Sequence, residues 1–234
     1  MVNGRRGGCL PKIVIGIVVL AVLAVGADFL AKNVAQDKLA SEIQQHGFPK
    51  KPSVSIEGFP FLTQVASRDI DQVRLNSTDI PEGPVRISRV SAVLSGIHLD
   101  SGYTSGTVSR LSGTVLITFG SLAKTLNSRI GPFGTLLSAT GMTLSSAGPD
   151  EIKASLDLLV TSGSATWRIS RLSGRELDAR LVGSSGVSSS MLNSISEFRI
   201  RIPKLPFNVR IGAVKITPAG VVGRISGSDL TFSG

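Results

Sequence analysis

The first part of the chain is a continuous hydrophobic run. Ile13–Ala27 contains fifteen residues without a charge, and two arginines and a lysine precede it. A basic segment followed by an apolar one is the layout of an export signal, and the small residues Val25 and Ala27 permit cleavage after Ala27. The run therefore predicts that the rest of the protein is exported from the cytoplasm.

A retained membrane anchor is the alternative to cleavage. Fifteen helical residues cover about 22 Å, which is short of the hydrocarbon core of roughly 30 Å. Extension of the helix through Ala31 reaches about 28 Å and carries Asp28 to the edge of the bilayer. We therefore predict a signal peptide or an N-terminal membrane anchor at residues 1–27 and a single domain at residues 28–234.

A helical pattern follows the hydrophobic run. Residues Asp28–His46 are mostly good helix formers without an internal glycine or proline, and Gly47 follows as a stop signal. One apolar stripe is formed by Leu30, Val34, Leu39 and Ile43. If the anchor is retained, this helix continues it away from the bilayer.

From Pro52 onward the hydrophobic period changes to two. Apolar and polar residues alternate in Val54–Glu57, Val73–Asn76, Val85–Ser88, Leu156–Leu158, Leu177–Leu181 and Phe198–Ile202. Alternation is typical of antiparallel strands with one buried face and one wet face. Two short helices, Ser121–Ile130 and Ser188–Phe198, each begin at a serine that can cap a helix. The pattern predicts an α+β fold, in which an N-terminal helix packs on a curved, mostly antiparallel sheet with two short helices.

Charge and composition limit the classes of binding partner that the chain suits. The net charge is +9, but the chain has no basic block and only 5% aromatic residues, which argues against nucleic acid. A mildly basic domain suits anionic phospholipid headgroups and a membrane surface. Cys9 is the only cysteine, and His46 and His98 are the only histidines, so we expect no disulfide, no metal and no cofactor.

Motifs of known catalytic chemistry are incomplete. Ser121 and Lys124 have the Ser-x-x-Lys spacing of penicillin-recognising enzymes, but the partner motifs of that chemistry are missing, and a helix cap explains Ser121. No Gly-x-Ser-x-Gly elbow occurs. We therefore predict no catalytic residue. A glycosidase carboxylate pair is recognised by distance rather than by spacing, which leaves an envelope hydrolase as an open alternative.

One motif resembles a known family. Glu57–Gln64 reads Glu-Gly-Phe-Pro-Phe-Leu-Thr-Gln and follows an export signal, a short helix and a first strand. In this it resembles the LmeA-like family of actinobacterial envelope proteins. Ala92–Leu99, Leu205–Phe207 and Val214–Val222 also resemble the family, whereas residues 120–186 carry no matching motif.

The resemblance implies phospholipid binding in a periplasm-like space, on the extracytoplasmic side of the plasma membrane. It also implies a tubular lipid-binding fold, in which a long helix lies in a strongly curved half-barrel sheet and acyl chains occupy the seam. For the name-giving members it implies support of mannan elongation in envelope lipoglycans, and so lipoglycan-synthesis enzymes as partners.

Three apolar groups are candidates for an acyl-chain pocket. The first surrounds Pro60, the second lies in a glycine-rich stretch, and the third lies on the second predicted short helix. Two further candidates are Trp167, on an alternating stretch, and Phe207, in the segment Leu205–Phe207 that resembles the family. The predicted lipid-binding residues are Phe59, Phe61, Leu62, Phe133, Leu136, Leu137, Met142, Trp167, Met191, Leu192 and Phe207. Such side chains suit flexible ligands, but ordinary core packing is the default explanation for them.

A basic stretch near the C-terminus is the candidate headgroup site. In a strand, Arg199 and Arg201 share one face, and Lys204 and Arg210 follow. Arginine can bind phosphate with two parallel hydrogen bonds, although a solvated strand face has the same pattern. The sequence thus favours a lipid-binding module, with a structural or adaptor domain that contacts envelope enzymes as the main alternative.

Overall fold

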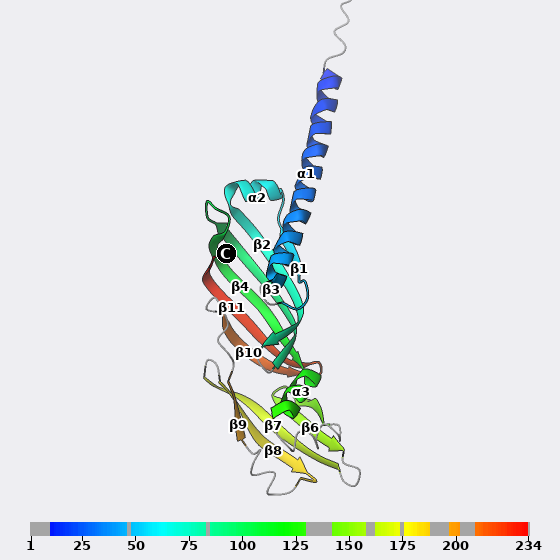
Figure 1. Cartoon of the computed structure of the whole chain (residues 1–234), viewed down its shortest axis with the longest axis vertical. Helices are drawn as coiled ribbons and strands as arrows, with labels where there is room; N and C mark the ends of the chain where they lie inside the picture. Colours follow the sequence, from blue (N-terminus) through cyan, green and yellow to red (C-terminus); the bar gives the residue numbers. More distant parts are fainter. Residues whose placement is uncertain are drawn as a thin grey trace, which may run out of the picture.

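The computed structural model describes residues 10–45, 48–82, 85–129, 142–157, 162–173, 176–187, 197–201 and 209–233. Within these ranges the chain forms three helices and eleven strands. Figure 1 shows an elongated molecule, with one long helix projecting from one end and a smaller sheet at the other. The predicted α+β class, a helix on curved antiparallel sheet, is confirmed.

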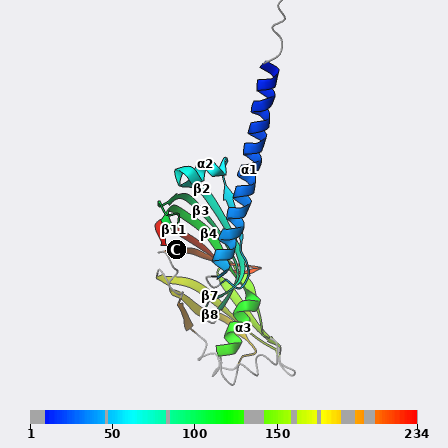
Figure 2. The ribbon, with the colours of Figure 1, turned by 45° about the horizontal axis from the view of Figure 1, so that its top comes forward.

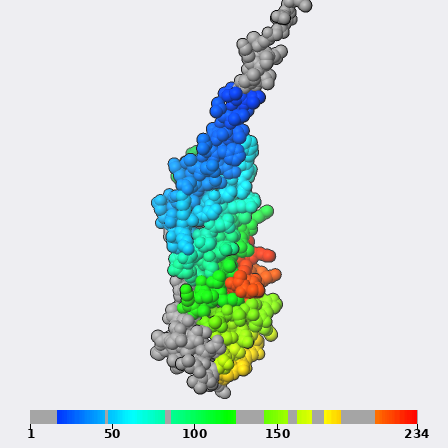
Figure 3. Space-filling model, turned by 90° about the vertical axis from the view of Figure 1, so that its right-hand side faces the viewer, coloured from blue at the N-terminus to red at the C-terminus, as the bar shows by residue number. Residues whose placement is uncertain are grey.

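The first helix, α1, runs without a break from Leu10 to Gln45. It joins the hydrophobic run to the predicted helix, and the side chains from Ile17 to Ala27 are all exposed. Its part Ile17–Gln45 is long and apolar enough to cross a membrane by length and composition. The space-filling view in Figure 3 shows how far α1 extends beyond the rest of the protein.

Sheet A is the larger sheet and has six antiparallel strands in the order β1-β2-β3-β4-β11-β10. Its strands are β1 (Ser53–Glu57), β2 (Asp69–Glu82), β3 (Val85–Leu99), β4 (Ser105–Thr118), β10 (Arg210–Thr217) and β11 (Gly220–Ser233). α1 packs against the edge strand β1, where Gln36 Oε1 accepts a hydrogen bond of 2.8 Å from the Ile56 N–H. The helix thereby satisfies a backbone donor that an edge strand leaves open.

Sheet B has five antiparallel strands in the order β5-β6-β7-β8-β9. Its strands are β5 (Thr143–Gly148), β6 (Glu151–Asp157), β7 (Ser162–Ser173), β8 (Glu176–Ser185) and β9 (Glu197–Arg201). It is an insertion between β4 and β10, and the helix α3 (Phe119–Arg129) contacts both β3 and β5. The Ile216 N–H donates to the Pro149 carbonyl at 3.0 Å, which ties β10 to the β5–β6 turn.

The hydrophobic core lies on one face of sheet A. Its buried members come from five strands and from the short helix α2 (Phe61–Ser67): Ile56, Phe61, Ile70, Ile97, Val108 and Leu230. Ala31 and Ala35 of α1 pack against this cluster. Small residues on α1 allow the helix to approach this cluster closely. Figure 1 shows α1 leaving sheet A at the end where α2 lies.

The structure differs from the sequence prediction in three elements. The strands form two sheets, and α2 was not expected. Helix α3 begins at Phe119, and Thr118 Oγ1 accepts a hydrogen bond of 3.4 Å from the Ser121 N–H, so Thr118 rather than Ser121 caps it. The predicted helix over 188–198 is wrong at Glu197 and Phe198, which lie in β9, and its other residues lie outside the described ranges.

Candidate functional site

The face of sheet A that carries the hydrophobic cluster, here called the inner face, is mostly apolar along its length. The register places Val73, Leu94 and Leu111 side by side at the cluster. Two positions further along each strand come Leu75, Ala92 and Gly113, and then Ser77, Val90 and Val115. Because side chains alternate between faces, these rows continue the apolar surface beyond the cluster.

Beyond the cluster, much of this apolar surface is only half-buried. The half-buried residues, here called the inner strip, come from five strands: Leu75, Val90, Val115, Ile117, Ile211, Val214 and Val221. Ala92, Ile216 and Ile225 between them are buried. A continuous band of valine, leucine and isoleucine that its own protein covers incompletely is the kind of surface that shelters hydrocarbon.

The Gly-Phe-Pro-Phe-Leu-Thr-Gln motif builds a tight corner between β1 and β2. Gln64 is buried and bridges the two strands: its Nε2 donates to the Glu57 carbonyl at 3.3 Å, and its Oε1 accepts from the Asp71 N–H at 2.9 Å. Gly58 has φ +93°, and a Cβ there would lie 2.4 Å from Gln64 Nε2. The glycine and the glutamine are therefore needed for the corner itself.

Helix α2 is capped by a residue distant in sequence. Its N-cap, Pro60, makes no side-chain cap hydrogen bond. Instead, the carboxylate of Asp28 on α1 accepts hydrogen bonds from the N–H of Phe61 at 2.9 Å and of Leu62 at 2.7 Å. Asp28 is 4% exposed although it directly follows the hydrophobic run. A carboxylate at a helix N-terminus is favourable, so this contact fixes α2 against α1.

The first predicted apolar group is divided by this geometry. Phe61 lies in the hydrophobic cluster at 5% exposure, whereas Phe59 and Leu62 are 60% and 46% exposed. The Phe59 ring lies 6.2 Å from the ring of Phe29 on α1. The motif thus contributes one side chain to the core and two to an exposed apolar surface beside α1.

The other predicted lipid-binding residues lie elsewhere. Trp167 is half-buried on β7, where its register neighbours are Ile152 and Leu181, and Met142 is half-buried just before β5. Both belong to the region of sheet B and are not brought together with Phe59 and Leu62, as Figure 2 also shows for the elements concerned. Outside the described residues lie Phe133, Leu136, Leu137, Met191, Leu192 and Phe207.

The predicted headgroup residues are aligned with acidic residues in the strand register. Arg199 and Arg201 of β9 pair with Asp178 and Glu176 of β8. This is a register of backbone positions, so headgroup binding by the two arginines stays a prediction. Arg210 is exposed at the start of β10, and Lys204 lies outside the described residues.

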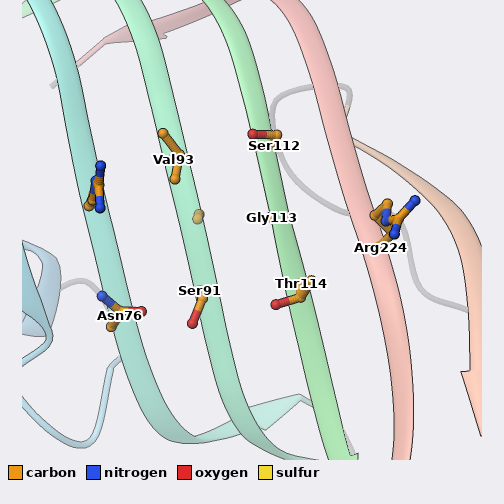
Figure 4. A pocket seen from close by; sticks show the side chains of 9 residues that line it. Asn76, Ser91, Val93, Ser112, Gly113, Thr114 and Arg224 are labelled. Carbon is orange, nitrogen blue, oxygen red and sulfur yellow. The ribbon is translucent and has the colours of Figure 1, made fainter.

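A second, polar surface lies on the opposite face of sheet A. An open depression of about 450 Å³ lies there. Figure 4 shows the hydroxyl-bearing side chains of β3 and β4 between Asn76 of β2 and Arg224 of β11. Arg74 also lines it, and its Nε lies 3.5 Å from Glu57 Oε1. Since this depression and the inner strip are on opposite faces, one lipid cannot place its headgroup in the depression and its chains on the strip.

Within the described ranges, no group of three or more His, Cys, Asp or Glu side chains could hold a metal ion. A carboxylate with several hydrogen bonds lies at the β3–β4 turn. There Asp100 accepts from the Ser105 hydroxyl and from three backbone N–H groups, which holds the pKa of Asp100 below its ordinary value. These hydrogen bonds order the β3–β4 turn.

A family model decides the relationship of the chain. The model of the LmeA-like phospholipid-binding family matches residues 26–226, which is most of the chain. The protein belongs to this family. No curated protein and no solved structure matches it. Family membership confirms the resemblance found in the sequence, and it makes the apolar inner strip the first surface to consider for lipid.

Sequence reasoning missed the inner strip, Asp28 and Gln64. The strip was encoded in the alternation of β3, β4 and β11, where every second residue is mostly valine, leucine, isoleucine, alanine or glycine. Asp28 was placed at the edge of the bilayer, but its role as the cap of α2 was not predicted. Its hydrogen-bond partners are 33 and 34 positions away, and no local pattern predicts them.

Proposed function

We propose that the protein binds a phospholipid at the extracytoplasmic surface of the plasma membrane, with the acyl chains on the inner strip of sheet A. Two observations support the proposal: the chain belongs to a phospholipid-binding family, and sheet A presents an apolar, half-buried strip. Burial of the acyl chains drives such binding and contributes about 0.8 kcal/mol for each methylene group. Binding of this kind needs no catalytic residue.

The dimensions of the strip support this assignment. Five neighbouring strands contribute to it, and strands lie about 4.8 Å apart, so the strip is roughly 19 Å wide. That width accommodates two acyl chains side by side. The Ser77 hydroxyl lies in the same row of sheet A as Val90 and Val115 of the strip. It is buried and has no hydrogen-bond partner in the described part of the chain.

Photo-crosslinking tests the location of the lipid. The full-length protein is purified in detergent, loaded with a phospholipid that carries a diazirine in one acyl chain, irradiated and digested. We expect crosslinks in β3, β4, β10 and β11 at strip residues such as Val90, Val115 and Val214. Crosslinks confined to the polar face of sheet A or to sheet B would contradict the proposal.

A matched pair of substitutions separates binding from stability. Val115→Thr places a hydroxyl on the inner strip, whereas Val93→Thr makes the same change on the polar face, where Val93 lines the depression. We expect Val115→Thr to weaken lipid retention several-fold, since a hydroxyl without a partner is costly in hydrocarbon. Val93→Thr is expected to bind as the wild type. Equal binding by all three proteins would contradict the assignment of the acyl chains to the inner strip, and binding by none of them would favour the adaptor alternative.

Export and anchoring are part of the same proposal. We propose that α1 crosses the plasma membrane, or is removed after Ala27, and that the sheets lie outside the cytoplasm. The native Cys9 precedes α1, and Val182→Cys introduces a thiol on β8 at a side chain that is 45% exposed. A thiol reagent that does not cross membranes should label the Val182→Cys variant in intact cells, whereas the wild type should stay unlabelled. If the Val182→Cys variant were labelled only after the cells are lysed, the result would contradict export.

The lipoglycan role rests on the family resemblance alone. We propose that lipid binding supports mannan-chain elongation, with the synthesis enzymes as partners. Cells that lack the protein should make shortened lipoglycan, and Val93→Thr should restore its length better than Val115→Thr. Restoration by both variants to the same extent would separate the lipoglycan role from the inner strip.

A further inference from the structure

The end of sheet A from which α1 leaves carries an exposed apolar surface. It consists of Phe29 on α1, Phe59 before α2, Leu62 on α2 and Tyr103 in the β3–β4 turn, here called the α2 platform. Their exposed fractions are 54%, 60%, 46% and 50%. The Tyr103 hydroxyl donates to the Val65 carbonyl of α2 at 3.3 Å, so the turn and the helix form one surface.

The composition of the platform is unusual for this chain. Aromatic residues make up only 5% of the sequence, and the chain has a single tyrosine. That tyrosine and two phenylalanines nevertheless gather at this end, with their side chains exposed. Exposed tyrosine next to an apolar helix is typical of the boundary between membrane and water, and exposed phenylalanine and leucine are typical of apolar faces that enter this boundary.

The hydrogen bonds of Asp28 fix the depth of the platform. The segment Ile13–Leu30, which extends the hydrophobic run past Asp28, has eighteen residues, or about 27 Å of helix, so all of it is needed to approach the thickness of a hydrocarbon core. Lys32, which follows Ala31, marks its polar end. If α1 crosses the membrane, Asp28 lies within one turn of this boundary. Because Asp28 is bonded to Phe61 and Leu62, α2 must lie at the same depth.

The same contact explains how an acidic residue is tolerated there. An unpaired carboxylate at the edge of the hydrocarbon would be costly. Asp28 is instead buried and accepts two backbone hydrogen bonds at the positive end of a helix. Figures 1 and 2 both show α2 crossing the end of sheet A beside α1, so that it would lie along a membrane surface if α1 passes through it.

We infer that the α2 platform rests in the surface of the same bilayer that α1 crosses, and that Asp28 is the positioning residue that holds it there. The inference relies on α1 as a membrane span, but it does not depend on lipid binding by the inner strip. Its consequence is a fixed orientation: the sheets stand away from the membrane, and sheet A is held by two attachments instead of one.

Tryptophan quenching tests the depth directly in the full-length protein. The native Trp167 is the only tryptophan, so Trp167→Phe gives a background without one. Phe59→Trp then reports on the platform, and Val182→Trp on sheet B is the matched control, since Val182 is also an exposed apolar residue. Each protein is reconstituted by α1 into lipid nanodiscs that contain phosphatidylcholine brominated close to its headgroup or close to the chain end.

We expect lipid brominated near the headgroup to quench Phe59→Trp roughly two-fold, lipid brominated at the chain end to quench it less, and neither to quench Val182→Trp. Equal absence of quenching for both positions would overturn the platform while leaving the anchor intact. Failure of the protein to remain with the nanodiscs would overturn the anchor and the platform together. Neither result affects the crosslinking test of the inner strip.

The role of Asp28 has its own control on the same helix. Asp37 is exposed and pairs with Lys51, so Asp37→Ala removes a carboxylate of α1 without touching α2. We expect Asp28→Ala to speed hydrogen exchange at the Phe61 and Leu62 amides by about ten-fold or more and to reduce quenching of Phe59→Trp, whereas Asp37→Ala should do neither. Quenching that is unchanged by Asp28→Ala would show that the platform does not need this positioning residue.

Discussion

Sheets A and B are both antiparallel, but they differ in what covers their apolar faces. In the described part of sheet A, large residues such as Ile70, Ile97 and Leu230 are buried, and α1 and α2 pack over them. In the described part of sheet B, the buried apolar residues are Ala154, Ala165 and Ala179. Burial of an isoleucine removes more apolar area from water than burial of an alanine, so sheet A carries the stronger hydrophobic core.

The two sheets also differ in the use of charge. Sheet B buries Asp178 at 1% exposure with Arg180 Nε at 2.8 Å, and its β8–β9 register aligns three pairs of opposite charges. Beside sheet A, the buried carboxylate of Asp28 lies at the end where α1 leaves and binds backbone N–H groups. Sheet A thus combines a covered end with a half-buried apolar strip, whereas the described part of sheet B buries alanines and one carboxylate that pairs with Arg180.

The largest effect is expected at the covered end of sheet A. Phe61→Ala removes a buried ring from the cluster and should lower the free energy of unfolding by about 3–5 kcal/mol. Denaturant unfolding of the full-length protein in detergent, followed by circular dichroism, measures this change. A loss below about 1 kcal/mol would mean that the cluster is not the main core.

A matched pair of isoleucines compares the two sheets directly. Ile97→Ala in sheet A removes a side chain that is buried, whereas Ile152 in sheet B is half-buried. We expect a loss of about 2–4 kcal/mol for Ile97→Ala and roughly half of that for Ile152→Ala. Hydrogen exchange should show the amides of sheet B opening before those of sheet A. A larger loss for Ile152→Ala than for Ile97→Ala would contradict the stronger hydrophobic core of sheet A.

The corner between β1 and β2 should give a smaller effect. Gln64→Ala leaves the Asp71 N–H and the Glu57 carbonyl without their partner, at a cost of about 1–2 kcal/mol. Gln72→Ala on the neighbouring strand is the control, since Gln72 is only half-buried. The corner would not depend on Gln64 if the two variants unfolded at the same denaturant concentration.

The smallest effect is expected at the β3–β4 turn and depends on pH. Hydrogen bonds from Ser105 lower the pKa of Asp100 below its ordinary value of 3.8. The turn is therefore stabilised above about pH 4, and the stabilisation is lost as pH falls through the lowered pKa. The protection of the Gly102 and Thr104 amides from hydrogen exchange, relative to their intrinsic rates, should fall below this pH, and Asp100→Asn should remove the pH dependence of the protection. An unchanged pH profile in Asp100→Asn would assign the effect to another group.

Local patterns predicted local structure well. The alternation from Pro52 onward predicted the strands β1 to β3, because a half-buried strand needs an apolar residue at every second position. It did not predict that the strands divide into two sheets, since alternation shows which face a residue occupies but not which strand lies beside it. The order β4-β11, which joins strands about a hundred residues apart, has no local signal.

The candidate site shows the same limit. The motif Gly58–Gln64 could be recognised, but whether its phenylalanines lie inside or outside depended on α2, whose cap comes from Asp28 on another helix. Phe59 and Phe61 are two positions apart and were grouped together, yet one is exposed and the other is buried. The predicted roles of Trp167, Met142 and the four basic residues stay predictions.

Native mass spectrometry of the full-length protein, released from detergent after purification without added lipid, tests the central proposal most directly. Lipid extraction of the same sample identifies what is bound. We expect a phospholipid in stoichiometric amount with the wild type and with Val93→Thr, and a reduced amount with Val115→Thr. A clean mass of the protein alone, unchanged after incubation with anionic phospholipid vesicles, would contradict lipid binding by the inner strip.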